Sequence, residues 1–243
     1  MTTRNAACLA EFSLSPLFTR QWSSIYEALQ DSRPERKKLM MLYIKQLEQQ
    51  VPITEHVLVA IDHTAWGRPD AKTLKDRTHE YQEGVIVGQG YSTIAWIPEE
   101  HRVGSPETKG SWALPLLHER ISSAEAPIPK AAEQLKQVCK QITNPVLAVL
   151  DREYGNATWV LAQAEIEADS LMRLRRNACL WSEPPAYGGR GRPRKHGQKM
   201  QLNDPETWSQ ADAMMEIDEH PQLGQVKVRQ WQNLHFYRAA GHP

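Results

Sequence analysis

The sequence predicts a mixed α/β fold, in which helices cover a sheet of parallel and antiparallel strands. Two observations support this prediction: short, wholly apolar runs typical of buried strands, and segments with helical periodicity around them. The 243 residues suffice for one large domain or two small ones with a substantial core. The apolar content of 40% and the charged content of 24% are ordinary for a soluble globular protein.

The N-terminal segment, residues 1–52, is expected to be helical. One helical pattern covers residues 20–29, and a second begins near Pro34 and ends at Pro52. Ser32 ahead of Pro34 is typical of a helix start. A helical pair packed on the core is the favoured interpretation. A module that binds DNA ends is the alternative, supported by lysines whose charge neighbouring glutamates dilute.

The middle of the chain, residues 53–176, alternates strand and helix patterns. The elements expected there are strands at 57–62, 84–88 and 91–97, a helix at 131–142, a strand at 146–150, a helix at 157–167 and a strand at 169–176. The second and third strands are expected to form a hairpin through Gln89-Gly90. Residues 102–110 are expected to form a loop. The order is that of a mixed sheet with helices on its faces.

Two aspartates, Asp62 and Asp151, each follow an apolar strand-like run. In open α/β sheets, the edge at the carboxyl ends of such strands is where ligands and metals bind. Two nearby carboxylates repel each other, and a divalent cation between them removes that repulsion. Mg²⁺ or Mn²⁺ prefers oxygen ligands and supports phosphodiester chemistry. We therefore predict a metal site at both aspartates; the alternative is that they only cap turns at strand ends.

A basic segment, residues 173–199, stands out in a chain of zero formal net charge. Its eight basic residues against Glu183 give it a net charge of +7. The basic residues are Arg173, Arg175, Arg176, Arg190, Arg192, Arg194, Lys195 and Lys199. The Gly-Arg-Pro-Arg core at 191–194 resembles an AT-hook, in which an extended Arg-Pro-Arg lies in a narrow minor groove. We predict binding to the phosphates of double-stranded DNA, and the alternative is a solvated basic loop.

The ordered motifs resemble the DDE transposases of bacterial insertion sequences. The resemblance rests on Ile61-Asp62-His63-Thr64-Ala65-Trp66 and on Leu150-Asp151-Arg152-Glu153-Tyr154-Gly155-Asn156, with the two acids 89 positions apart, and on four shorter pieces. These pieces are Arg68-Pro69, Ala71-Lys72-Thr73-Leu74, Trp112-Ala113-Leu114-Pro115 and Trp231-Gln232-Asn233-Leu234-His235. It implies a ribonuclease-H-like fold with Asp62 on the first strand and Asp151 on the fourth. It also implies cleavage and strand transfer at transposon ends with two Mg²⁺ ions.

The third acid of that family is a glutamate on a helix after a late β-rich insertion. We find no such pattern here, because the acids considered after residue 176 suit structural roles. Those considered are Glu183, Glu206, Glu216, Asp218 and Glu219. The expected organisation is therefore a helical segment at 1–52, an incomplete catalytic core at 53–176, and a basic linker with a partial insertion, including a strand at 226–231, at 177–243. We predict a truncated transposase that is inactive or weak alone.

Several function classes are disfavoured by the sequence. Cys8, Cys139 and Cys179 form no CxxC pair, so neither a disulfide framework nor a zinc ribbon is supported. No signal peptide or membrane span is evident, and a cytoplasmic location is expected.

A DNA-binding remnant that competes with full transposase stays open as the second interpretation. An unrelated phosphatase or nuclease, using His63 or Asp70 as further ligands, ranks last. The oligomeric state stays open, with a homodimer as one option.

Overall fold

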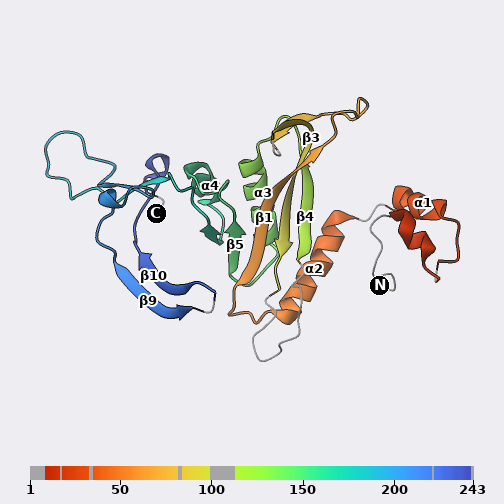
Figure 1. The fold of residues 1–243 in the computed structure, drawn as a ribbon, viewed down its shortest axis with the longest axis horizontal. Coiled ribbons are helices and arrows are strands. Elements are labelled where there is room, and N and C mark those ends of the chain that lie inside the picture. The colour runs from red at the N-terminus through yellow and green to blue at the C-terminus, as the bar shows by residue number, and fades with distance from the viewer. Residues whose placement is uncertain are drawn as a thin grey trace. The chain divides into compact units, whose positions relative to one another are not determined.

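The computed structural model describes residues 9–16, 18–32, 35–81, 84–98, 113–220 and 222–241. The chain divides into two compact units, Met1–Tyr43 and Ile44–Pro243. The second unit carries a mixed α/β sheet, so the predicted fold class is confirmed (Figure 1). The boundaries predicted at residues 52 and 176 stay predictions.

The N-terminal region is helical, as predicted. Its elements are a 3₁₀ helix η1 (Leu9–Leu14), α1 (Ser23–Asp31) and α2 (Arg36–Gln50). The start signal at Ser32-Arg33-Pro34 lies partly outside the described residues. In the second unit, the last turns of α2 bury Ile44 and Leu47. Asn144 ties the following turn to the sheet, because its amide nitrogen donates to the carbonyl of Pro52 at 2.7 Å.

Six strands form the central sheet of the second unit. The strands are β1 (Val57–Gly67), β2 (Thr78–Tyr81), β3 (Val85–Trp96), β4 (Leu114–Ile121), β5 (Val146–Leu150) and β6 (Asp169–Met172). The order is β2-β3-β1-β5-β6, with β4 also paired to β3. β1 runs antiparallel to β3 and parallel to β5, and β5 runs parallel to β6. This is a ribonuclease-H-like arrangement, with an antiparallel half and a parallel half.

The predicted hairpin at Gln89-Gly90 is wrong, because β3 runs through both residues without a turn. Glycine at 88 and 90 suggested a turn, but each glycine instead allows a close approach. A Cβ atom at Gly88 would lie 2.1 Å from the carbonyl oxygen of Trp66, and one at Gly90 would lie 2.7 Å from His63 Nε2. β2 and β4 were not predicted. The loop expected at 102–110 lies outside the described residues.

Two helices, α3 (Pro127–Cys139) and α4 (Ala157–Gln163), follow the predicted positions with shifted ends. α3 contacts β1, β3 and β4, and α4 contacts α3 (Figure 1). Apolar side chains of both helices are fully buried, among them Leu135, Val138 and Trp159. Helices therefore cover one face of the sheet, which we call the helix face.

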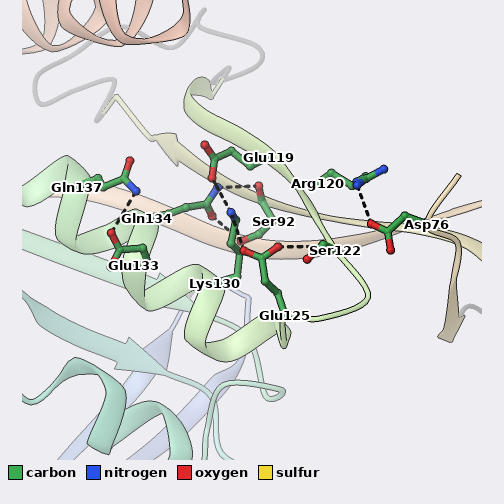
Figure 2. A network of polar contacts seen from close by, with 10 residues as sticks. All are labelled: Asp76, Ser92, Glu119, Arg120, Ser122, Glu125, Lys130, Glu133, Gln134 and Gln137. Atoms are coloured by element: carbon green, nitrogen blue, oxygen red, sulfur yellow. Dashed lines mark hydrogen bonds and ion pairs between the residues drawn. The ribbon is translucent and has the colours of Figure 1, made fainter.

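A polar network fixes α3 to the helix face (Figure 2). Ser92 of β3 donates its hydroxyl to Gln134 Oε1 at 2.6 Å, and the Gln134 amide donates to the carbonyl of Ser92 at 3.2 Å. Both residues are fully buried. Lys130 lies 3.0 Å from Glu119 of β4 and 3.1 Å from Glu125. Burial lowers the pKa of Lys130, but hydrogen bonds and charges of both glutamates outweigh it and raise that pKa overall.

Glu125 stabilises the turn that precedes α3. Its carboxylate accepts a hydrogen bond from the backbone N–H of Ser122 at 2.9 Å. Hydrogen bonds from Ser122, and then the contact with Lys130, lower the pKa of Glu125 from 4.5 to about 2. The charged carboxylate therefore stabilises the fold above pH 4.5, and this contribution is lost as the pH falls toward 2.

We expect Glu125→Gln to lower the free energy of unfolding at pH 7 relative to the wild type. Since protonation removes the same interaction from the wild type, the difference should shrink between pH 4.5 and pH 2. Urea denaturation at several pH values measures it. Glu133→Gln, on the exposed side of α3, is the matched control. A difference between Glu125→Gln and wild type that is independent of pH would contradict the assignment.

The C-terminal part of the second unit contains two small sheets. Its elements are β7 (Cys179–Trp181), β8 (Lys199–Gln201), η2 (Pro205–Thr207), β9 (Ala213–His220), β10 (Gly224–Gln230) and η3 (Tyr237–Ala239). β7 pairs with β8, and β9 pairs with β10. β10 matches the strand predicted at 226–231. No helix among the described residues combines the length and the apolar character needed to cross a bilayer.

Candidate functional site

The parallel pairing of β1 with β5 sets Asp62 beside Asp151. Ile61 pairs with Leu150, and each aspartate is the next residue of its chain. Neighbouring strands lie about 4.8 Å apart, and alternation places both aspartates on the same side of the sheet. That side is opposite the helix face, since Ile61 and Leu150 are buried while both aspartates are exposed. We call it the Asp62 face.

The turn after β5 holds Asp151 in place. Asp151 Oδ1 accepts the backbone N–H of Glu153 at 2.8 Å. The Asn156 side chain closes the turn by donating to the carbonyl of Glu153 at 2.7 Å, and its oxygen caps α4 by accepting from Thr158 N at 2.9 Å. Asp151 thus has the turn-capping role considered as the alternative. That role uses one carboxylate oxygen, and the side chain remains exposed.

Gly155 brings this turn against the end of β6. A Cβ atom at Gly155 would lie 2.5 Å from the carbonyl oxygen of Arg173. This contact is too short, and because it involves a backbone atom, it could be relieved only by a shift of the backbone. The turn that carries Asp151 is therefore packed directly on the strand next to β5. Larger side chains at Gly155 would displace it.

Tyr154 is a buried side chain close enough to both acids to be influenced by their charges. It is 1% exposed, and its hydroxyl has no hydrogen-bond partner among the described residues. Burial raises the pKa of Tyr154 strongly, and the nearby charges of Asp62, Asp151 and Glu153 raise it further. The phenol is therefore a neutral group close to both acids. The sequence motif contains this residue, but nothing in the sequence indicates its burial.

Because the Tyr154 hydroxyl is buried without a partner, we expect Tyr154→Phe to keep or raise the free energy of unfolding by about 1 kcal/mol. The ring contact with Trp159, at 5.4 Å between centroids, is retained in Phe. Thermal unfolding measures the change. Tyr154→Ala is the comparison variant and should be strongly destabilised. A loss of more than about 1 kcal/mol in Tyr154→Phe would show that the hydroxyl has a partner in solution.

Two further side chains extend the row of the aspartates across the Asp62 face. Asp62 pairs with Thr93 of β3, and Thr93 pairs with His118 of β4. The Thr93 hydroxyl and His118 Nδ1 are 2.8 Å apart. Neither residue was predicted to belong to the site, and the strand that carries His118 was not predicted either. The segment Leu114–Ile121 gives little indication of a strand, because Leu-Pro-Leu-Leu is followed by His-Glu-Arg without alternation of polar and apolar residues.

His63 lies on the other side of β1, as its alternation with Asp62 predicts. Its Nε2 atom is 3.1 Å from Glu80 Oε2, without a hydrogen bond between them, and Glu80 is buried. Asp70 lies in the turn after β1 and is exposed. His63 thus does not join Asp62 as a ligand, which removes the main support for the unrelated-phosphatase interpretation.

The basic segment lies after β6 and between β7 and β8. All eight of its basic side chains are exposed, and none forms an ion pair with a described residue. The AT-hook-like core lies in the connection from β7 to β8, where the Tyr187 hydroxyl donates to the carbonyl of Gly191 at 2.7 Å. Its cations are therefore available to an anionic partner.

No third acid joins the pair in the part of the chain that the structure describes. Within those residues, no group of three His, Cys, Asp or Glu side chains could hold a metal ion. Glu183 lies in the connection after β7, and Glu206 lies in η2, where Asp204 caps the turn. The remaining candidates lie on β9, where Glu216 pairs with Lys227 at 2.8 Å. Cavities of about 550 and 500 Å³ lie beside α3, away from both aspartates.

The second unit thus has a ribonuclease-H-like sheet in which Asp62 and Asp151 directly follow paired residues of two adjacent parallel strands. The family model of the DDE superfamily endonucleases matches residues 9–235, and the chain belongs to this family. The resemblance to DDE-type transposases is thereby confirmed, and with it a nuclease type of function. The predicted truncation stays a prediction. No curated protein matched the chain.

Proposed function

We propose that this chain is a DNA transposase subunit in which Asp62 and Asp151 hold a divalent metal ion. The observation that supports the proposal is the parallel register of β1 and β5, in which Asp62 and Asp151 are exposed and directly follow the paired residues Ile61 and Leu150. Mg²⁺ typically binds through one or two carboxylates and takes its remaining ligands from water and substrate phosphates. The donor set therefore fits Mg²⁺ or Mn²⁺.

The proposed reaction is cleavage and strand transfer at transposon ends. A bound ion would polarise a phosphodiester and lower the pKa of an attacking water. The protein's own contribution is to fix the two carboxylates: Asp62 through the pairing of β1 with β3, and Asp151 through its hydrogen bond with Glu153 N–H.

Weak cleavage is part of the proposal, because the described residues offer two carboxylates and no third. The test is a strand-cleavage and strand-transfer assay on labelled duplex DNA in Mg²⁺, in Mn²⁺ and in EDTA. We expect metal-dependent nicking that is slow, and that is absent from an Asp62→Asn, Asp151→Asn double variant purified in parallel. Nicking retained in the double variant would overturn the proposed site. Robust turnover by the wild type would contradict the expectation that cleavage is weak.

A second candidate is a DNA-binding chain that competes with a complete transposase for DNA ends. The unpaired, exposed basic segment favours it independently of the carboxylates. In this case DNA binding should persist in EDTA, and no nicking should appear in either metal. The two candidates therefore differ in the cleavage assay and agree on DNA binding.

We expect Arg192→Ala with Arg194→Ala to weaken DNA binding and to flatten its salt dependence. Each phosphate contact contributes about 0.9 to the slope of log K against log salt, so losing two contacts should reduce that slope by about 2. Fluorescence anisotropy at several salt concentrations measures it. Lys37→Ala with Lys38→Ala, in the N-terminal helical segment, is the matched control. An unchanged slope in the arginine variant would refute the AT-hook assignment.

A further inference from the structure

The Asp62 face carries a row of aromatic rings. The aromatic row consists of Trp66 of β1, Tyr91 of β3 and His118 of β4. The centroids of Trp66 and Tyr91 are 6.1 Å apart at 64°, and those of Tyr91 and His118 are 5.0 Å apart and parallel within 1°. Trp66, the second-to-last residue of β1, is 43% exposed, although tryptophan is highly buried on average.

The aromatic row is held in position by polar contacts. The Tyr91 hydroxyl donates to Gln89 Oε1 at 2.9 Å, and the Gln89 amide donates to the carbonyl of Lys75 at 3.2 Å. Gln89 is only 4% exposed, so this anchor is shielded from water. At the other end, Thr93 contacts His118 at 2.8 Å. Since the rings of Tyr91 and His118 are fixed before binding, a ligand that stacks on them costs little side-chain entropy.

The border of the aromatic row is positively charged. The turn at residues 68–77 follows β1 and carries four basic residues against two acids. Arg68 lies over the Trp66 ring, with Cζ 4.1 Å from the ring centroid. Arg120 is neutralised by Asp76 at 2.7 Å, and hydrogen bonds with Ser123 and then the charge of Arg120 lower the pKa of Asp76. A surface of this kind, with rings beside cations, matches bases attached to phosphates.

We infer that the aromatic row binds unpaired bases of the DNA strand that reaches the Asp62–Asp151 pair. Trp66 lies four residues along β1 from Asp62 on the same face, roughly 13 Å away. That span corresponds to about four steps of a stacked nucleic-acid strand. Stacking on an exposed ring accepts any base, so it suits an enzyme that must hold frayed or cleaved ends. The choice of DNA as the ligand rests on the proposed function.

The test compares two labelled duplexes in EDTA, one blunt and one with a four-nucleotide single-stranded overhang, by fluorescence anisotropy. We expect Trp66→Ala to lower affinity for the overhang duplex about tenfold and to leave the blunt duplex unchanged. Trp66→Phe should retain most of the affinity. Tyr81→Ala, which removes an 80% exposed ring from β2, is the matched control. Equal losses on both duplexes, or no loss, would overturn the inference.

A second measurement needs no variant and so does not depend on the folding of Trp66→Ala. With 2-aminopurine in the overhang, stacking by the wild-type protein should quench its fluorescence, and unchanged fluorescence at saturation would overturn the inference. Because EDTA removes metals, the result is independent of cleavage. A nicking assay that fails while quenching persists counts against the proposed function alone. Absence of all DNA binding by the wild type would count against both.

Discussion

Asp62→Asn should abolish the stabilisation that Mn²⁺ gives to the wild-type chain. An ion that binds only the folded state at ten times its dissociation constant stabilises the wild type by about 1.4 kcal/mol. For a domain of this size that corresponds to about 3–6 °C in Tm. The neutral amide is nearly isosteric with the carboxylate but lacks its charge, so the shift should vanish. Thermal unfolding with and without Mn²⁺ measures it, and does not depend on catalysis.

Without metal, Asp62→Asn should unfold at the same temperature as the wild type or slightly higher. The side chain is exposed, and the substitution removes repulsion from the neighbouring Asp151. Any nicking in Mn²⁺ should fall on the order of 100-fold. Asp70→Asn, an exposed acid in the turn after the same strand, is the matched control and should keep the metal shift. A full Mn²⁺ shift in Asp62→Asn would show that the ion binds elsewhere.

Trp159→Ala should lower the free energy of unfolding by about 3–5 kcal/mol, the largest effect on stability that we expect. Trp159 is fully buried on α4, and its ring packs edge-to-face on Tyr154. Its indole N–H also donates to the Ser170 hydroxyl of β6 at 3.1 Å, so truncation removes one partner of that hydroxyl. Urea denaturation of Trp159→Ala and of the wild type measures the loss.

The matched control for Trp159→Ala is Leu161→Ala on the same helix. Leu161 is 46% exposed, so its truncation should change stability by less than about 0.5 kcal/mol. Trp159→Phe keeps the ring contact and loses the hydrogen bond, so it should fall between Trp159→Ala and the wild type. A loss below about 1 kcal/mol in Trp159→Ala would mean that the turn carrying Asp151 is supported mainly by its own hydrogen bonds.

The parallel half of the sheet follows from the sequence more readily than the antiparallel half. The runs before Asp62 and Asp151 are apolar throughout, with one face buried and the other partly buried, and short runs of this kind are typical of strands in a parallel sheet. β3 was divided at Gln89-Gly90 because sequence alone does not show that Gly88 and Gly90 accommodate backbone and side chains of neighbouring elements. β4 was missed because its burial depends on pairing with β3, a contact far away in the sequence.

In the candidate site, too, the features of the parallel strands could be predicted from the sequence and those of the antiparallel strands could not. The parallel pairing of the two strands that carry Asp62 and Asp151 could be predicted, because each acid follows a recognisable apolar run. The prediction that the first strand ends at Asp62 is wrong, because β1 continues to Gly67. Thr93, His118 and Tyr91 could not be predicted, because their side-by-side placement depends on the register of three strands. The exposure of the basic segment agrees with its charge, since unpaired cations are rarely buried.

The contact between Gly155 and the carbonyl of Arg173 links the position of one acid to the end of β6. A single added methyl group at this glycine would tilt the whole turn and, with it, the carboxylate at its start. The apolar strands would stay paired, because their hydrogen bonds lie on the far side of the turn. A chain altered in this way would remain folded and still hold nucleic acid through its cations, while its two acids no longer aligned. The activity of the site could therefore be lost while the fold is retained.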